Sequence, residues 1–189
     1  MDQAEKAEAF RGLHDRKDVL VLPNACDVPS SWVFENEGFP VVATSSAGML
    51  VSLGHPDAEG IPRGDFVAAI RRISGVLTVP LSADLVGGFG DNPEEVAKSA
   101  RAVVEAGAVG INIEDYIHGA KGLPPVPELR KLGVARVSFG PTASYAAMGL
   151  VKQASREVLE KGTYDTLTEG AIDFDELNSL AVPRNPVRP

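Results

Sequence analysis

Residues 79–113 read VPLSADLVGGFGDNPEEVAKSARAVVEAGAVGINI, and this stretch decides the fold. Two short apolar runs, at residues 79–83 and 109–113, have the length of buried strands. Between them, Asn92 and the proline after it mark the start of a helix, and Gly107 marks its end. The stretch therefore predicts a strand, a helix and a second strand, which is the repeating unit of a parallel sheet covered by helices.

The same alternation of short apolar runs and helix-length amphipathic segments extends in both directions from this unit. Residues 45–63 are expected to form a long loop. Further strands are predicted at residues 18–22, 41–44 and 134–139, and helices at residues 3–13, 29–36, 65–73, 128–132, 143–159, 163–167 and 174–180.

Five strands joined by helices fit two α/β architectures, an open doubly wound sheet and a closed eight-stranded (β/α)8 barrel of about 250 residues. The strand pattern does not choose between them. A chain of 189 residues suits one domain, which we expect at residues 1–182, with a disordered proline-containing tail at residues 183–189. In both architectures the chemistry lies at the carboxyl ends of the strands.

Composition limits the kinds of partner. The net charge is −8, which disfavours nucleic acid because phosphate binding needs clustered Lys and Arg. No apolar stretch approaches the ~20 residues that a membrane span needs, and no signal sequence follows the charged N-terminus, so we expect a cytoplasmic protein with no membrane partner. The single cysteine, Cys26, excludes an internal disulfide and fits a reducing compartment.

Polar side chains, most of them carboxylates, follow several of the predicted strands. Asn24 and Asp27 follow the first, Asp84 the third, and Glu114 and Asp115 the fourth. Acids that converge at one end of a sheet suit a hard cation such as Mg²⁺, which binds through one or two carboxylates and retained waters. The alternative interpretation is that each acid caps the helix that follows it.

The second strand ends instead in a turn of small residues, Ser45, Ser46, Ala47 and Gly48. Such a turn offers backbone N–H groups that can hold an anion. A substrate carboxylate or phosphonate is therefore expected there, so that the partner is a small anionic molecule.

Several motifs occur in a fixed order along nearly the whole chain. They are FPVVATSSAG at residues 39–48, SLGHPD at 52–57, PLSAD at 80–84, GFGDNPEE at 88–95, EAGAVGINIED at 105–115 and LGVARVSFGP at 132–141. The series resembles the isocitrate lyase / phosphoenolpyruvate mutase superfamily. The resemblance implies a TIM-barrel-type α/β fold, and a Mg²⁺-dependent lyase, mutase or hydrolase that acts on a small α-oxo or 2-hydroxy acid, or on a phosphonate, through an enolate.

The resemblance also implies roles for individual residues. Ser45, Ser46 and Ala47 would bind the carboxylate end of the substrate. Asp57 would lie on a loop over the site, Asp84 would be the principal metal ligand, and Glu114 would support the water shell of the metal.

The family pattern has a second metal-site acid two residues after the position of Asp84. This chain has Val86 there, so it departs from the pattern. The reactive cysteine that the lyase branch carries after its fourth strand is also absent, which favours mutase-like or oxaloacetate-hydrolase-like chemistry.

The largest departure lies after Glu114. The chain passes almost directly to the motif of the eighth strand, so the barrel is expected to lack strands five to seven, about 60–80 residues. The family's arginine near an Asn-Ala-Arg motif then has no assignable equivalent. Such a barrel has two open strand edges, so either the remaining strands close differently, or another subunit fills the gap, or the fold is marginal. The resemblance implies association through terminal helices, and a homo-oligomer is therefore expected. The alternative function is an inactive family remnant that acts as a ligand-binding or oligomerisation module.

Overall fold

A computed structural model describes residues 1–15, 18–56, 61–113, 125–131, 136–138 and 140–181. All strand pairings in these residues are parallel, as the alternating pattern predicts. The strands are β1 (Leu20–Leu22), β2 (Asn24–Ala25), β3 (Val42–Thr44), β4 (Leu81–Asp84), β5 (Gly110–Asn112) and β6 (Arg136–Ser138).

The strand order is that of an open sheet. β6 pairs with β1, and β2 pairs with β3, which pairs with β4, which pairs with β5. β1 and β2 are separated by Pro23 alone. The Pro23 carbonyl accepts a hydrogen bond of 2.8 Å from the Ala43 N–H of β3, so β1 and β2 together join the β6 pairing to the other strands of the sheet. Within the described residues β5 and β6 each have a partner on one side, and the sheet does not close.

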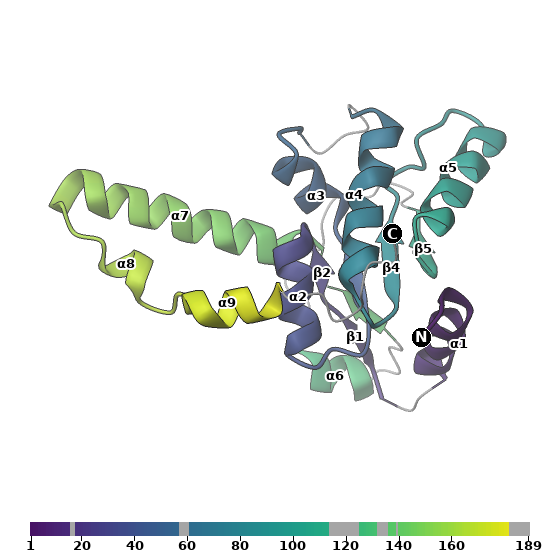
Figure 1. Cartoon of the computed structure of the whole chain (residues 1–189), viewed down its shortest axis with the longest axis horizontal. Helices are drawn as coiled ribbons and strands as arrows, with labels where there is room; N and C mark the ends of the chain where they lie inside the picture. Colours follow the sequence, from purple (N-terminus) through teal and green to yellow (C-terminus); the bar gives the residue numbers. More distant parts are fainter. Residues whose placement is uncertain (16–17, 57–60, 114–124, 132–135, 139, 182–189) are drawn as a thin grey trace.

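Three helices cover the outer face of the sheet and lie side by side, α2 (Val28–Asn36), α4 (Arg63–Val76) and α5 (Pro93–Glu105) (Figure 1). The starts of α2 and α5 follow the predicted capping chemistry, because Asp27 accepts from the Ser30 N–H, and Asn92 accepts from two N–H groups of α5. The main core lies between these helices and the strands. Its largest fully buried side chains include Phe66, Ile70, Ile73, Leu81 and Val103.

The inner face of the sheet is closed toward the amino ends of the strands by α1 (Gln3–His14). Phe10 and Leu13 of α1 pack with Leu20 and Leu22. The ring of Phe10 lies so close to Gly110 of β5 that an added Cβ would meet a ring atom at 2.5 Å. A glycine is therefore needed at this position in β5. Because α1 covers the amino ends of the strands, the accessible end of the inner face is at their carboxyl ends.

One predicted loop is wrong. Residues 45–63 contain a seven-residue helix, α3 (Ser46–Ser52), which begins directly after β3. Ser45 caps it by accepting a 3.2 Å hydrogen bond from the Gly48 N–H. Gly48 packs against Cys26, whose Cβ would lie 2.9 Å from a Cβ added at Gly48, so the close contact between α3 and β2 requires a residue without a side chain.

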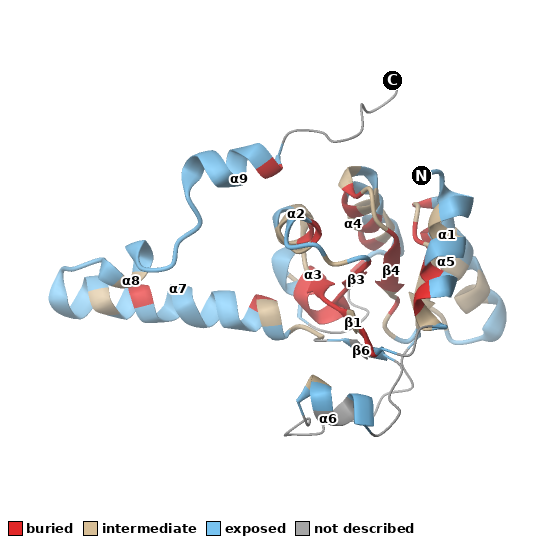
Figure 2. Cartoon of the chain, turned by 90° about the horizontal axis from the view of Figure 1, so that it is seen from below, coloured by how far each residue is buried: buried red, intermediate tan, exposed pale blue. Residues whose placement is uncertain are grey.

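The C-terminal part forms an arm that projects from the body (Figure 1). The short helix α6 (Val126–Lys131) is not part of this arm. The arm consists of α7 (Thr142–Lys161), α8 (Asp165–Thr168) and α9 (Phe174–Leu180). Most of its residues are exposed (Figure 2), and the exposed ones include large apolar side chains. Of the helices in the described residues, none has the length and hydropathy required to traverse a membrane.

The predicted elements are otherwise present, and their bounds differ by a few residues. The tail that we expect to be disordered, residues 183–189, lies outside the described residues.

Candidate active site

A polar cavity of about 80 Å³ lies at the inner face of the sheet, toward the carboxyl ends of the strands. A single water needs about 10–15 Å³, so there is room for several waters or one small acid. Residues from every strand of the sheet contribute to the lining. They are Leu22, Asn24, Ala43, Thr44, Ser82, Asp84, Asn112, Arg136, Ser138 and Gly140.

Asp84 is the carboxylate of this cavity. It is the last residue of β4, and it points to the same face as Ser82 because alternate strand residues share a face. Its Oδ2 accepts hydrogen bonds from the Ser46 hydroxyl at 2.8 Å and from the Ser46 N–H at 3.1 Å. Its Oδ1 accepts from the Val86 N–H at 3.2 Å, and its own N–H donates to the Thr44 hydroxyl. The carboxylate is therefore held in one orientation by two neighbouring segments.

The three small residues after β3 differ in what they have left to offer a ligand. The Ser45 hydroxyl is used in capping α3, and both donors of Ser46 are used by Asp84. Among the described residues no hydrogen bond to the Ala47 N–H is found. All three residues are buried. A carboxylate bound at this turn would thus meet the Ala47 N–H, or would share Ser46 with Asp84.

Asn24 of β2 links β3 and the segment after β6 at the rim of the cavity. Its side-chain amide donates to the Thr44 carbonyl at 2.8 Å, and its Oδ1 accepts from the Gly140 N–H at 2.9 Å. It is buried, with 7% of its surface exposed, so these bonds fix the segment after β6 beside β2. Asn112 lines the cavity from β5, opposite Asp84 in the strand register.

Val86 has an unusual backbone conformation, with φ of +55°. This left-handed region disfavours L-residues, and a β-branched side chain is an outlier there, whereas Asn, Asp and Gly are enriched. Val86 also packs against the main core. The backbone at this position thus suits an acid or amide better than the valine that occupies it.

The donor set fits a Mg²⁺ ion in one limited way. An ionised carboxylate offers about four lone-pair positions. Three of those on Asp84 are taken, which leaves about one for a cation. Among the residues that the structure describes, no three His, Cys, Asp or Glu side chains are grouped to hold a metal. A metal here would be held by Asp84 together with water and substrate oxygens, as is common for Mg²⁺.

Two residues implied by the family resemblance, Asp57 and Glu114, lie outside the described residues. Glu114 is two residues beyond Asn112, the last residue of β5. Their roles stay predictions.

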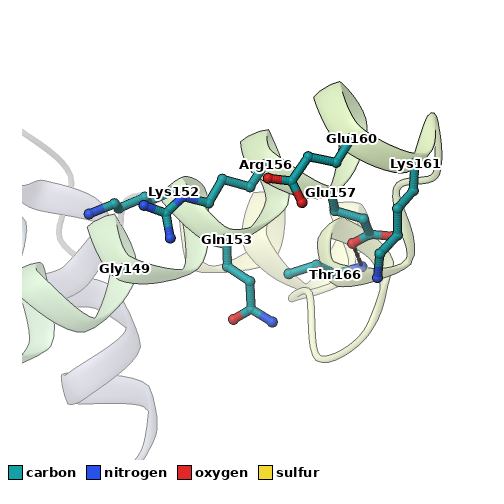
Figure 3. Close-up of a pocket in the computed structure, with 8 residues that line it drawn as sticks. All are labelled: Gly149, Lys152, Gln153, Arg156, Glu157, Glu160, Lys161 and Thr166. Atoms are coloured by element: carbon teal, nitrogen blue, oxygen red, sulfur yellow. Dashed lines mark hydrogen bonds between the residues drawn. The ribbon is translucent and has the colours of Figure 1, made fainter.

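Two other cavities lie away from the strand ends. One of about 450 Å³ lies between α7 and α8 and is lined by side chains of both charges, including Lys152, Arg156 and Glu157 (Figure 3). The other, about 410 Å³, is an apolar groove between α2, α3, α7 and α9, and Cys26 lies at its edge. Asp27, which follows β2, lies in the wall of this groove, and its carboxylate caps α2 by accepting from the Ser30 N–H.

Sequence reasoning did not identify Ser82, Asn112 or Arg136 as lining residues. The alternation of Leu81, Ser82, Ala83 and Asp84 along β4 was a usable signal, because the polar members share one face. Arg136 gave no such signal, since only the pairing of β6 with β1 brings it to the cavity.

Parallel strands with covering helices define an α/β fold related to the TIM barrel. The model of the family described as phosphoenolpyruvate phosphomutase matches residues 10–125. The chain belongs to this family, within the phosphoenolpyruvate mutase / isocitrate lyase superfamily.

Among sequence relatives, an uncharacterized protein of Mycobacterium tuberculosis is 31% identical over 158 residues, which are 84% of this chain and 53% of that protein. The 2-methylisocitrate lyase of Escherichia coli is 31% identical over 115 residues, 60% of this chain and 38% of the lyase. The chain thus spans about half the length, or less, of these relatives.

Solved structures share the fold. A proposed lyase/mutase from Burkholderia cenocepacia superimposes with a TM-score of 0.88 and 26% identity, over 97% of this chain and 98% of that one. Phosphonopyruvate hydrolase, solved with oxalate and Mg²⁺, gives a TM-score of 0.66 and 16% identity, over 96% and 95% of the two chains. Members of the superfamily include lyases, mutases and hydrolases that act on small acids.

Proposed function

We propose that the chain is a Mg²⁺-dependent enzyme that acts on a small α-oxo or 2-hydroxy acid, or on a phosphonate, through an enolate form of the substrate. The observation that carries this proposal is the Asp84 carboxylate, fixed by Ser46 and Val86 in a polar cavity of about 80 Å³. The cavity has the size of such an acid, and the carboxylate has one acceptor position left for a cation.

When bound, Mg²⁺ would stabilise the negative charge that develops on the enolate oxygen of the substrate. Asp84 would hold the ion, and Ser46 would keep the carboxylate oriented. The Ala47 N–H would bind the substrate's carboxylate, while Ser45 keeps α3 in place through its cap. Asp57 and Glu114 would complete the site as the resemblance implies, one over the cavity and the other beside the metal's waters.

The single cysteine favours some reactions of the family over others. Cys26 follows β2, at the edge of the apolar groove, and is not among the residues lining the polar cavity. The described lining of the polar cavity therefore contains no cysteine that could act as acid or base beside the metal. We propose mutase-like or hydrolase-like chemistry for this reason. The cysteine also fits a reducing compartment, and we propose that the enzyme acts in the cytoplasm.

The test is a thermal unfolding scan of the purified chain with Mg²⁺, with oxalate, and with both. Oxalate is a planar mimic of an enolate. A ligand at about 100 times its dissociation constant adds about 2.7 kcal/mol to the free energy of unfolding, which raises Tm by several degrees. We expect a shift only when both are present.

Asp84→Asn is the control variant, because it keeps the shape of the side chain and removes its charge. It should abolish the joint shift. A cooperative transition with no shift in the original protein would contradict the proposal and would favour a module that does not bind this ligand pair.

The partner that we propose besides the substrate is a second copy of the chain. The exposed apolar side chains of the α7–α9 arm and the unpaired edges of the described sheet are the features that support it.

A further inference from the structure

The paired strands fall into two sets, and a side chain joins them at their carboxyl ends. β1 pairs with β6, and β2, β3, β4 and β5 form the other set. Asn24 of β2 accepts a hydrogen bond of 2.9 Å from the Gly140 N–H, just after β6. Its amide donates at 2.8 Å to the carbonyl of Thr44, the last residue of β3. Asn24 therefore ties the β6 side of the polar cavity to the β3 side.

Thr44 continues this connection to the carboxylate residue of the cavity. Its hydroxyl accepts a hydrogen bond of 2.9 Å from the Asp84 N–H, while its carbonyl accepts from Asn24. Thr44 is fully buried, so bulk water does not compete for either oxygen. A hydrogen-bond relay thus runs from the segment after β6 through Asn24 and Thr44 to Asp84, and all of its members line the cavity.

The relay matters because the sheet does not close within the described residues. In these residues, strand pairing connects β4 to β6 only through β3 and the adjoining β1 and β2. The two walls of the cavity could therefore move relative to each other at their carboxyl ends. The relay crosses this distance with side-chain contacts, so it sets where Asp84 lies relative to the wall that follows β6.

We propose that Asn24 and Thr44 are positioning residues, which hold Asp84 where a metal and its acid ligand can meet both walls of the cavity. This inference rests on the proposed function, because it takes Asp84 as the metal ligand. Both residues act through Asp84 and not on the reacting atoms. A displacement of about 1 Å can cost about 100-fold in a site of this kind, so a broken relay weakens ligand binding even where the fold survives.

The experiment measures the dissociation constant for oxalate in excess Mg²⁺ by calorimetry. Thr44→Val keeps the shape of the side chain and removes the acceptor of the Asp84 N–H. We expect oxalate binding to weaken by about 10-fold, and the Asp84 N–H to exchange with solvent at least about 10-fold faster in an NMR measurement. Thr44→Ser retains the hydroxyl and should recover most of the affinity.

Thr78→Val is the matched control for stability. The Thr78 hydroxyl donates at 2.6 Å to Glu35 in the segment that leads into β4, away from the cavity. The same substitution therefore removes one hydrogen bond there too and should lower the free energy of unfolding, which urea unfolding measures. The dissociation constant for oxalate should stay within about 2-fold of that of the original protein, since Asp84 keeps its contacts.

A second pair of variants tests whether the two residues form one relay. Asn24→Ala removes both contacts of the amide and should weaken oxalate binding by about 10-fold. The double variant of Asn24→Ala and Thr44→Val should bind within about 3-fold of the weaker single variant, because each change breaks the same relay. A loss equal to the product of the two single losses would show that they act independently.

The outcomes separate this proposal from the proposed function. If the original protein binds oxalate with Mg²⁺ and Thr44→Val binds it unchanged, the positioning role is wrong and the proposed function stands. Equal losses of affinity in Thr44→Val and Thr78→Val, or independent losses in the double variant, also overturn the positioning role alone. If the original protein shows no Mg²⁺-dependent binding of oxalate, both proposals are wrong.

Discussion

At the scale of single residues, the site is built around one carboxylate that is already hydrogen-bonded. Asp84 reaches from β4 to the start of α3, where Ser46 donates twice to it. The contacts that fix Asp84 also occupy both hydrogen-bond donors of Ser46, which a substrate carboxylate would otherwise use. Within this turn the Ala47 N–H is then the donor left for a substrate carboxylate.

Ser46→Ala tests the importance of the hydroxyl contact. It removes the 2.8 Å hydrogen bond to Asp84 and leaves the one from the N–H. Hydrogen bonds to charged groups contribute about 1.5–3 kcal/mol, and the partial exposure of this one lowers the expected loss of unfolding free energy to about 1–2 kcal/mol. Urea unfolding measures it. Ser52→Ala removes an exposed hydroxyl at the other end of α3 and should cost less than about 0.5 kcal/mol. Equal losses in the two variants would contradict a special role for the contact with Asp84.

Val86→Asp tests the absent second acid. The left-handed backbone at Val86, with φ of +55°, accepts Asp or Asn more readily than Val. We expect Val86→Asp to bind Mg²⁺ at least about 10-fold more tightly, since the family resemblance implies a second metal-site acid at this position. Val86→Asn is the matched control, which has the same shape and no charge. A titration of Mg²⁺ measures both, and an unchanged affinity in Val86→Asp would count against Asp84 as the metal ligand.

At the scale of helices and strands, buried polar side chains fix how neighbouring elements meet. Glu35 of α2 is buried, with 8% of its surface exposed, and its Oε1 accepts from the Thr78 N–H, the Thr78 hydroxyl and the Val79 N–H. These bonds join α2 to the segment that leads into β4, the strand that carries Asp84. Burial also lowers the pKa of the nearby Lys6, and the charge of Glu35 opposes that shift.

Glu35→Ala should therefore destabilise the protein strongly. Two backbone N–H groups, at Thr78 and Val79, would lose their acceptor, and each unsatisfied buried donor costs about 1–3 kcal/mol. We expect a loss of about 3 kcal/mol in unfolding free energy. Glu37→Ala, at the exposed end of the same helix, should change it by less than about 0.5 kcal/mol. A loss below about 1 kcal/mol for Glu35→Ala would show that water replaces the carboxylate.

Glu157 provides a prediction of pH dependence at the junction of α7 and α8. Hydrogen bonds, first that from the Thr163 hydroxyl and then those from Thr166, hold the pKa of its carboxyl at about 2, below the ordinary 4.5 (Figure 3). Because the folded pKa is the lower one, the junction is fully stabilised above pH 4.5 and loses this contribution as the pH falls toward 2.

An NMR titration of the Glu157 carboxyl should thus give a midpoint near 2. In Thr163→Val, which lacks the hydroxyl, the midpoint should be higher. A midpoint near 4.5 in the original protein would mean that α8 does not dock on Glu157 in solution.

The sequence alone predicted the alternation of strands and helices well, because β1, β3 and β4 lie in compact apolar runs, and the outer helices α2 and α5 have clear caps. It did not predict α3, since Ser-Ala-Gly-Met-Leu-Val-Ser has no helical period and begins in a turn of small residues. Asp84 was identifiable from its place after a strand. The contact between Asp84 and Ser46, and the presence of Arg136 in the same cavity, depend on packing and strand order, which no local pattern contains.

At the scale of the whole molecule, a sheet that has two unpaired edges among the described residues carries a long exposed arm. The inner face is closed at one end by α1 but not by further strands in the described residues. The arm leaves Tyr145, Met148 and Leu159 between 52% and 85% exposed. Apolar surface on this scale is unusual for a monomer and is typical of an interface. The apolar groove beside α2 and α9, about 410 Å³ in volume, has Met148 in its wall.

Association through this arm is the last prediction. We expect the purified chain to elute as a dimer or larger species in size-exclusion chromatography with light scattering. Met148→Glu places a charge in the apolar groove, where burial against a partner would cost several kcal/mol, and should shift the population to monomer. Gln153→Glu makes the same change of charge on the polar side of α7 and should leave the assembly intact (Figure 3). If the original chain is a monomer at all concentrations, or if both variants dissociate alike, the arm is not the interface, and the open sheet must be stable without a partner.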